Sequence, residues 1–173
     1  MIVYWTAYAV ILVGCAYLGI IFSDSFRKRV RQLEEFEMVI KQMEFDIDFL
    51  NTPLARTLKR LSGMSDGVVG DVVGYVCDGL SGTSCVDMQN LWKKALERFE
   101  NRLNLTLEDK KIILDFSKNL GCGDRTREKN NINAALMRLK VAEDDARIAA
   151  AKNIRMYRGL GVLVGIFIVI VLL

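Results

Sequence analysis

The sequence predicts an all-α fold, a bundle of about six helices between two apolar segments, and three observations support this prediction. Apolar residues recur at helical spacing along most of the chain. A single proline among 173 residues leaves long stretches without a helix breaker and disfavours a proline-punctuated β architecture. Every charged residue lies between Asp24 and Arg158, so both ends are uncharged. We therefore expect a transmembrane helix over residues 2–22, a cytosolic helical domain over 23–158 and a transmembrane helix over 159–173.

The N-terminal apolar segment, residues 2–22, is long enough to cross the hydrocarbon core of a bilayer, which takes about 20 helical residues. The C-terminal segment, 159–173, is shorter and reaches across when Arg155 and Arg158 extend their charged ends to the interface. A lipoprotein signal ending before Cys15 is an alternative, but the positive charge that precedes such signals is missing. A buried core helix is the alternative at the C-terminus, where the run from Val162 is apolar on every face.

Basic residues beside the two segments predict their orientation. Arg27, Lys28 and Arg29 follow the first segment, Arg155 and Arg158 precede the second, and no basic residue flanks either outer end. The positive-inside rule then places the domain in the cytosol and both termini on the extracytoplasmic side. We expect these basic side chains to anchor the domain to anionic lipid headgroups of the bilayer.

The second apolar segment carries a G-x-x-x-G motif, formed by Gly161 and Gly165. Two small residues at this spacing let helices approach closely in a membrane. The motif predicts packing against the first segment near Gly14 and Gly19, or against another subunit in a homo-oligomer. Its alternative is a chance occurrence in a glycine-tolerant segment.

The first helix of the domain is expected to continue directly from the first apolar segment. An unbroken stripe with alternating spacings of three and four consists of Leu33, Phe36, Ile40, Met43, Ile47 and Leu50. The opposite face is charged and comprises Glu34, Glu35, Glu37, Lys41, Glu44, Asp46 and Asp48. The stripe packs either in the core of the same chain or in an intermolecular coiled coil.

Two helices are expected next. Thr52 can cap the first of them and Pro53 suits its first position, with Leu54, Leu58 and Leu61 on its apolar side and a loop over 62–67. The valines over residues 68–76 lie at helical spacing and favour a helix, although β-branched residues also permit a strand. A second loop covers 79–83.

The remaining helices begin with capping signals. Residues 84–87 read as one capping box and residues 106–109 as another, each followed by apolar residues on one face. Trp92 is expected to be a core anchor of the first of these helices. Gly121 is expected to end the second helix and, with Asp124 as the next N-cap, to shape the turn between helices. The last helix then runs without a break from about Thr126 into the second apolar segment.

No catalytic, cofactor-binding or metal-binding residues emerge from the sequence. The chain lacks histidine, which excludes Ser-His-Asp and Cys-His catalysis and histidine-ligated metal sites. Phosphate-binding glycine loops and a basic stripe with interleaved aromatics are also missing, which argues against nucleotide and nucleic-acid binding. The consecutive carboxylates Glu143, Asp144 and Asp145 are expected on a solvated helix surface, and the cysteines are expected to be reduced and structural.

The order of motifs resembles the stage III sporulation protein AB family of endospore-forming bacteria. The motifs that carry the resemblance are residues 51–54 (NTPL), 92–96 (WKKAL), 107–109 (LED), 119–125 (NLGCGDR) and 157–165 (YRGLGVLVG). The chain departs from the family pattern at Ala55-Arg56, where Pro-Glu is usual, and at Lys129, where Gln is usual. The resemblance spans nearly the whole chain.

The resemblance implies a non-enzymatic platform protein in the mother-cell membrane facing the forespore, needed during engulfment. The soluble region of the family is similar to the cytoplasmic helical domain of type II secretion and type IV pilus platform proteins (GspF-like). By that likeness, the partners are a cytosolic hexameric ATPase of the same operon and the membrane subunits of a secretion-like channel. The competing hypotheses are a membrane-anchored helical binding module or regulator, which a groove with exposed apolar residues would favour, and an integral-membrane enzyme.

Overall fold

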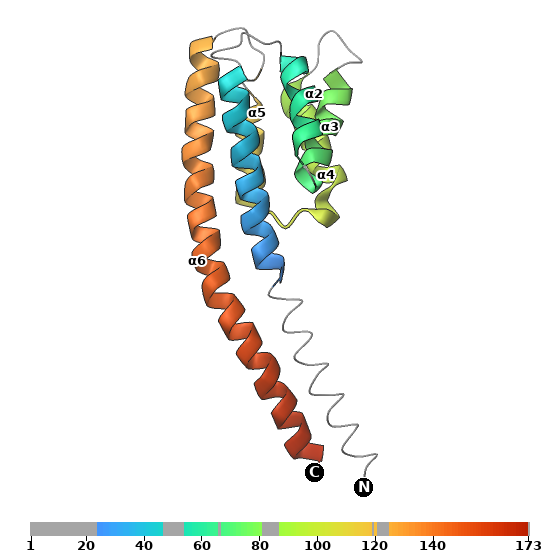
Figure 1. The fold of residues 1–173 in the computed structure, drawn as a ribbon, viewed down its shortest axis with the longest axis vertical. Coiled ribbons are helices and arrows are strands. Elements are labelled where there is room, and N and C mark those ends of the chain that lie inside the picture. The colour runs from blue at the N-terminus through green and yellow to red at the C-terminus, as the bar shows by residue number, and fades with distance from the viewer. Residues whose placement is uncertain are drawn as a thin grey trace. The chain divides into compact units, whose positions relative to one another are not determined.

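The structure is a computed structural model that describes residues 24–46, 54–65, 67–80, 87–118, 120 and 125–172. Within these ranges it contains six α-helices and a short 3-10 helix, and none of the described residues is in a strand (Figure 1). The all-α prediction with about six helices is therefore confirmed. Several predicted features lie outside the described residues, namely the apolar segment 2–22, Ile47, Leu50, Thr52, Pro53, Ser84, Gly121 and Asp124.

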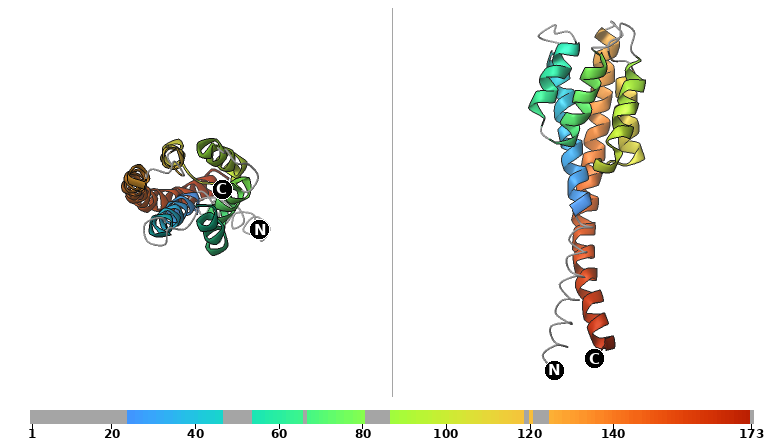
Figure 2. Two further views of the ribbon diagram at one scale, coloured as in Figure 1. Left: turned by 90° about the horizontal axis from the view of Figure 1, so that it is seen from above. Right: turned by 90° about the vertical axis from the view of Figure 1, so that its right-hand side faces the viewer.

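The chain divides into two compact units. One comprises Arg31–Asp144, and the other comprises Met1–Val30 with Asp145–Leu173. The larger unit holds most of the helices and both grooves described below. In Figure 2, its helices form a bundle in which residues 31–46 lie on one side and helices α4 and α5 on the other.

The first described helix covers residues 24–46. Leu33, Phe36, Ile40 and Met43 are almost completely buried within the larger unit. Their stripe is therefore part of the core of its own chain, and it is not the seam of an intermolecular coiled coil. Gln32 adds a polar contact, because its side-chain amide binds the backbone of residues 102 and 104.

Helices α2 (Leu54–Met64) and α3 (Val68–Leu80) form a hairpin around a tight turn. The N–H of Ser65 donates to the carbonyl of Leu61 at 3.0 Å, which extends α2 into the predicted loop. Gly67 has a φ of 96°, a left-handed conformation that glycine adopts without steric cost. The valine-rich segment is helical, as its spacing predicted, and Val69, Val72, Val73 and Val76 are fully buried.

Helices α4 (Met88–Arg98) and α5 (Leu107–Ser117) flank the short helix η1 (Glu100–Arg102). The cap of α4 is Asp87, whose carboxylate accepts from the N–H groups of Gln89 and Asn90, so the predicted start at Ser84 is wrong. The capping box of Thr106 and Asp109 is confirmed. Trp92 is buried and meets Phe116 edge to face at 6.2 Å between ring centroids, which confirms it as a core anchor.

The last helix, α6, runs unbroken from Arg125 to Leu172, close to the predicted start near Thr126. Ile132, Ala135 and Leu139 face the core of the larger unit. None of the described helices is both long enough and apolar enough to cross a membrane.

Two acidic residues that the sequence placed on solvated faces are buried. Asp46 is 1% exposed, and its carboxylate accepts hydrogen bonds from Arg60 of α2 and from Gln42. Glu143 of α6 is 2% exposed and accepts from the Lys140 ammonium at 3.1 Å. In both cases a basic side chain supplies the opposite charge that permits burial of a carboxylate.

Candidate functional site

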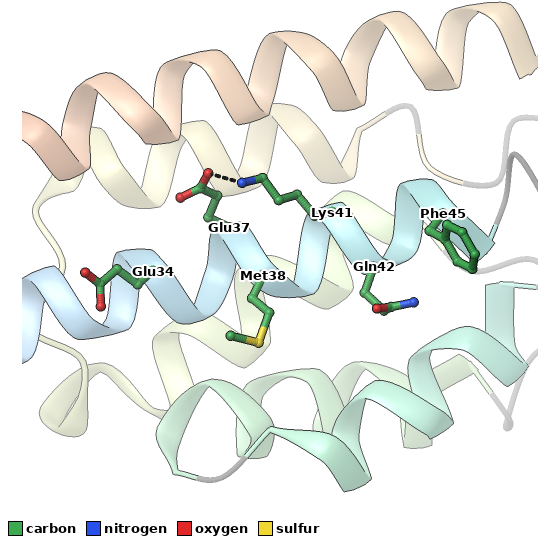
Figure 3. A pocket seen from close by; sticks show the side chains of 6 residues that line it. All are labelled: Glu34, Glu37, Met38, Lys41, Gln42 and Phe45. Carbon is green, nitrogen blue, oxygen red and sulfur yellow. Dashed lines mark ion pairs between the residues drawn. The ribbon is translucent and has the colours of Figure 1, made fainter.

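The candidate site is a groove of about 530 Å³ along the outward face of the first helix (Figure 3). We name it the Met38–Phe45 groove after the two apolar residues within it. Its lining comprises Glu34, Glu37, Met38, Lys41, Gln42 and Phe45. These residues lie on the side of the helix opposite the buried stripe. The stripe residues Leu33, Phe36, Ile40 and Met43 recur at spacings of three and four and point into the core, so the residues between them point outward.

The two apolar side chains of the groove are exposed. Met38 is 67% exposed and Phe45 is 47% exposed, about two helical turns further along. Apolar groups surrounded by polar ones are the usual composition of a protein-binding surface, and methionine in particular adapts to different partners. The groove is therefore suited to contact with another protein.

Charged residues form the edge of the groove toward α6. The Lys41 ammonium lies 2.6 Å from the Glu37 carboxylate, and Figure 3 shows this pair pointing away from Met38 and Gln42. The hydrogen bond from Lys41 is the main cause that lowers the pKa of Glu37, and Glu143 acts in the same direction. The hydrogen bond to Glu143 raises the pKa of Lys140. Lys41, Glu37, Glu143 and Lys140 thus form one charged network between the first helix and α6, in which the two carboxyl groups are neighbours and a lysine lies at each end.

A second groove, of about 310 Å³, lies between α4 and α5. Its lining comprises Lys93, Leu96, Glu97, Glu100, Leu107, Lys110, Lys111 and Leu114. Leu107, at the start of α5, is 83% exposed. Lys110 pairs with Glu100 at 2.6 Å and Lys93 approaches Glu97 at 3.9 Å. This α4–α5 groove thus combines a protruding leucine with several lysines.

The residues singled out from the sequence lie elsewhere. Arg27 and Lys28 are exposed near the start of the first helix, where Lys28 pairs with Asp24 at 3.0 Å. Arg29 is half-buried in the same helix. Gly161, Gly165, Arg155 and Arg158 all lie in α6, whereas Gly121 and Asp124 fall outside the described residues.

Sequence reasoning missed both grooves. The available signal for the first was that Met38 and Phe45 interrupt a charged helix face at the spacing of about two turns. In the described ranges, no cluster of three or more cysteine or carboxylate side chains is placed to hold a metal ion.

Comparisons with known proteins identify the family. The family model of stage III sporulation protein AB matches residues 4–173. The chain is similar to stage III sporulation protein AB of Bacillus subtilis (strain 168), with 25% identity over 163 residues that cover 94% of this chain and 95% of that protein. It is also similar to a solved structure of a stage III sporulation protein AB. The TM-score is 0.66 at 23% identity, over 72% of this chain and 97% of that one, a likeness that shows the fold. The resemblance carried by the sequence motifs is confirmed, and the chain belongs to the stage III sporulation protein AB family.

Proposed function

We propose that this sporulation protein is a non-enzymatic inner-membrane platform in a secretion-like channel between mother cell and forespore. It couples a cytosolic hexameric ATPase to the membrane subunits of that channel. The match to the family model over nearly the whole chain supports a role in sporulation. The GspF-like resemblance of the soluble domain supports the role of platform.

The observation that carries the coupling role is helix α6. It contains both the last core helix of the charged domain and residues 159–172 of the C-terminal apolar segment, within one helix of 48 residues. The connection between them is therefore helical, with no loop. A helix transmits a displacement along its axis, whereas a flexible linker absorbs it.

The proposed location is the mother-cell membrane facing the forespore, with the domain in the cytosol and both termini outside it. Arg27, Lys28 and Arg29 support this arrangement, because they follow the first apolar segment and the first two are exposed to solvent. They would lie at the cytosolic headgroups of the bilayer, together with Arg155 and Arg158.

The first experiment is crosslinking and pull-down of the tagged full chain from sporulating cells, followed by identification of the captured proteins. The platform proposal expects a secretion-type ATPase and membrane subunits of the channel in the same eluate. Recovery of neither class would refute it.

A second experiment tests the coupling role of α6 through the exposed Ala151. The variant Ala151→Pro breaks the helix, since proline costs about 3 kcal/mol in a helix interior, while Ala151→Ser keeps it. We expect Ala151→Pro to retain the captured partners and to lose heat-resistant spores, and Ala151→Ser to sporulate normally. Normal sporulation of both variants would contradict the coupling role.

The Met38–Phe45 groove favours a second candidate, a membrane-anchored binding module or regulator. Its exposed apolar side chains are what an amphipathic helix of a signalling protein would bind. The pull-down separates the candidates, because a regulator would capture a signalling protein and no ATPase.

A further inference from the structure

One end of the larger unit is where the chain both enters and leaves it. The unit comprises Arg31–Asp144. Near its beginning, Gln32 binds the backbone of residues 102 and 104, so η1 and the segment that leads into α5 lie beside the start of the first helix. Near its end, Glu143 of α6 lies beside Glu37, less than two turns into the unit. We call this part of the unit the entry end.

The turn between α2 and α3 belongs to the entry end as well. The Arg102 guanidinium lies 2.7 Å from the Asp71 carboxylate, which joins η1 to the first turn of α3. Met64, the last residue of α2, precedes that turn. On the other side of η1, the Lys110 ammonium of α5 lies 2.6 Å from the Glu100 carboxylate. The entry end therefore comprises the α2–α3 turn, η1 and the start of α5, held together by two ion pairs.

The entry end exposes large apolar side chains. Leu107, the first residue of α5, is 83% exposed, which is more than any other large apolar residue that the structure describes, and Met64 is 65% exposed. The two ion pairs neutralise the charges of η1. The exposed Arg98 guanidinium lies 5.5 Å from the centre of the Tyr75 ring and pairs with no carboxylate in the described ranges. Apolar side chains with a guanidinium beside them suit a lipid interface, where the apolar groups meet acyl chains and the guanidinium binds phosphate.

The chain on either side of the unit indicates which surface the entry end faces. Residues 2–22 and 159–173 are uncharged and long enough to be the expected membrane segments. Residues 24–31 are helical and rise about 12 Å. The headgroup layer of a bilayer takes up about 5–8 Å of such a distance, and helix tilt and long side chains cover the rest. A protein that bound the entry end would have to displace the bilayer from it.

We propose that the entry end contacts the bilayer surface, with Leu107 and Met64 at the boundary of the acyl chains and Arg98 at the lipid phosphates. This inference rests on the membrane location given under the proposed function. It goes beyond that location, because two apolar segments would hold the domain at the membrane without any contact between the bundle and lipid. The contact would fix the orientation of the bundle on the membrane.

The experiment is fluorescence quenching of the full-length chain in vesicles of phosphatidylethanolamine and phosphatidylglycerol. The native cysteines are replaced by alanine, and a bimane label is attached through Leu107→Cys, Met64→Cys or the control Met137→Cys. Met137 is 72% exposed and precedes Arg138, which approaches Asp115 at the opposite end of α5. The quencher is a phospholipid with a nitroxide on its headgroup.

We expect the nitroxide lipid to reduce the fluorescence of the labels at positions 64 and 107 and to leave the label at 137 unchanged. Quenching at 107 that is no greater than at 137 would overturn the proposal. Acyl-brominated lipids in the same vesicles report insertion of Trp5, because Trp92 is buried in the domain. Quenched Trp5 with an unquenched label at 107 would refute the contact and leave the membrane location standing. Unquenched Trp5 would overturn both.

A charge at Leu107 tests whether the leucine itself makes the contact. Leu107→Asp should weaken the quenching of the label on Met64→Cys, since a carboxylate avoids the acyl boundary and is repelled by anionic headgroups. An acidic residue in the first turn of α5 suits the helix, and circular dichroism checks that the variant is folded. Leu107→Ile should keep the quenching. Unchanged quenching in Leu107→Asp would refute insertion of Leu107.

Discussion

Two glycines of α3 should respond in opposite directions to the same substitution. Gly70 lies in the first turn of the helix, and a Cβ added there would lie 1.9 Å from the carbonyl oxygen of Ser65. Gly74 lies one turn later, and its added Cβ would be 3.7 Å from the nearest described atom, the Cβ of Ser62. Replacement of each glycine by alanine therefore separates helix propensity from steric fit.

At Gly74 the alanine fits, so the variant should gain stability from helix propensity alone. Alanine is favoured over glycine in a helix interior by about 1 kcal/mol, and we expect Gly74→Ala to raise the free energy of unfolding by about 0.5–1 kcal/mol.

At Gly70 the same gain is opposed by a clash with backbone. The 1.9 Å gap must widen to the 3.4 Å of ordinary van der Waals contact, and Ser65 is held by its hydrogen bond to Leu61. Forcing an added carbon into a packed site costs about 1–3 kcal/mol, which exceeds the propensity gain. We expect Gly70→Ala to lower the free energy of unfolding by about 1–2 kcal/mol.

The assay is urea unfolding of the full-length chain in detergent, followed by circular dichroism, with thermal melts as a second readout. Each kcal/mol should shift the melting temperature by about 2–4 °C in a chain of this size. Shifts of the same sign and similar size for the two variants would refute the geometric argument, since propensity alone would then explain both.

Three further predictions concern polar contacts and the core. Gln32→Ala removes hydrogen bonds of 3.0 and 2.7 Å to backbone groups, and it should lower the free energy of unfolding in urea by about 1–3 kcal/mol. The control Gln89→Ala should change it by no more than about 0.5 kcal/mol. Equal losses for the two variants would contradict the stabilising role of the Gln32 hydrogen bonds. The pKa of Glu37 is lower in the folded chain than its ordinary value of 4.5, so its carboxylate stabilises the fold at pH values above 4.5. This contribution is lost as the pH falls through the pKa of Glu37 in the folded state. Unfolding curves of wild type and Glu37→Gln should therefore converge in acid, and a pH-independent difference would exclude the role of Lys41. Trp92→Ala should cost about 3–5 kcal/mol, and a loss below 1 kcal/mol would show that the ring is not packed as described.

The helical elements could be predicted because their signals are local. The stripe that includes Leu33 and Phe36, the valines of α3 and the capping box at Thr106 depend on residues within one or two turns. Periodicity and capping encode such features directly in the sequence. The cap of α4 was misplaced because Ser84 and Asp87 are both good N-cap residues at adjacent turns.

The polar interior could not be predicted, because its partners come from distant parts of the chain. Asp46 is buried with Arg60, which lies on another helix, and Gln32 binds backbone 70 residues further along. The residue pattern along one helix indicates which side of that helix is apolar. It does not indicate which acidic side chain will pair with a basic side chain from another helix of the bundle. The α4–α5 groove depends on the same kind of tertiary proximity, because its lining comes from two helices. The described lining of the Met38–Phe45 groove lies on one helix, so Met38 and Phe45 left a trace in the sequence.

The burial of Trp92 gives this protein an intrinsic optical probe. The chain has two tryptophans, and Trp92 is enclosed in the larger unit against Phe116. The Trp92 side chain is completely buried, so its ring is shielded from bulk solvent in the folded domain. With Trp5→Phe, fluorescence would come from Trp92 alone, at short wavelength in the native domain and at long wavelength once the core opens. The state of the domain would then be readable in the intact full-length chain, without any attached label.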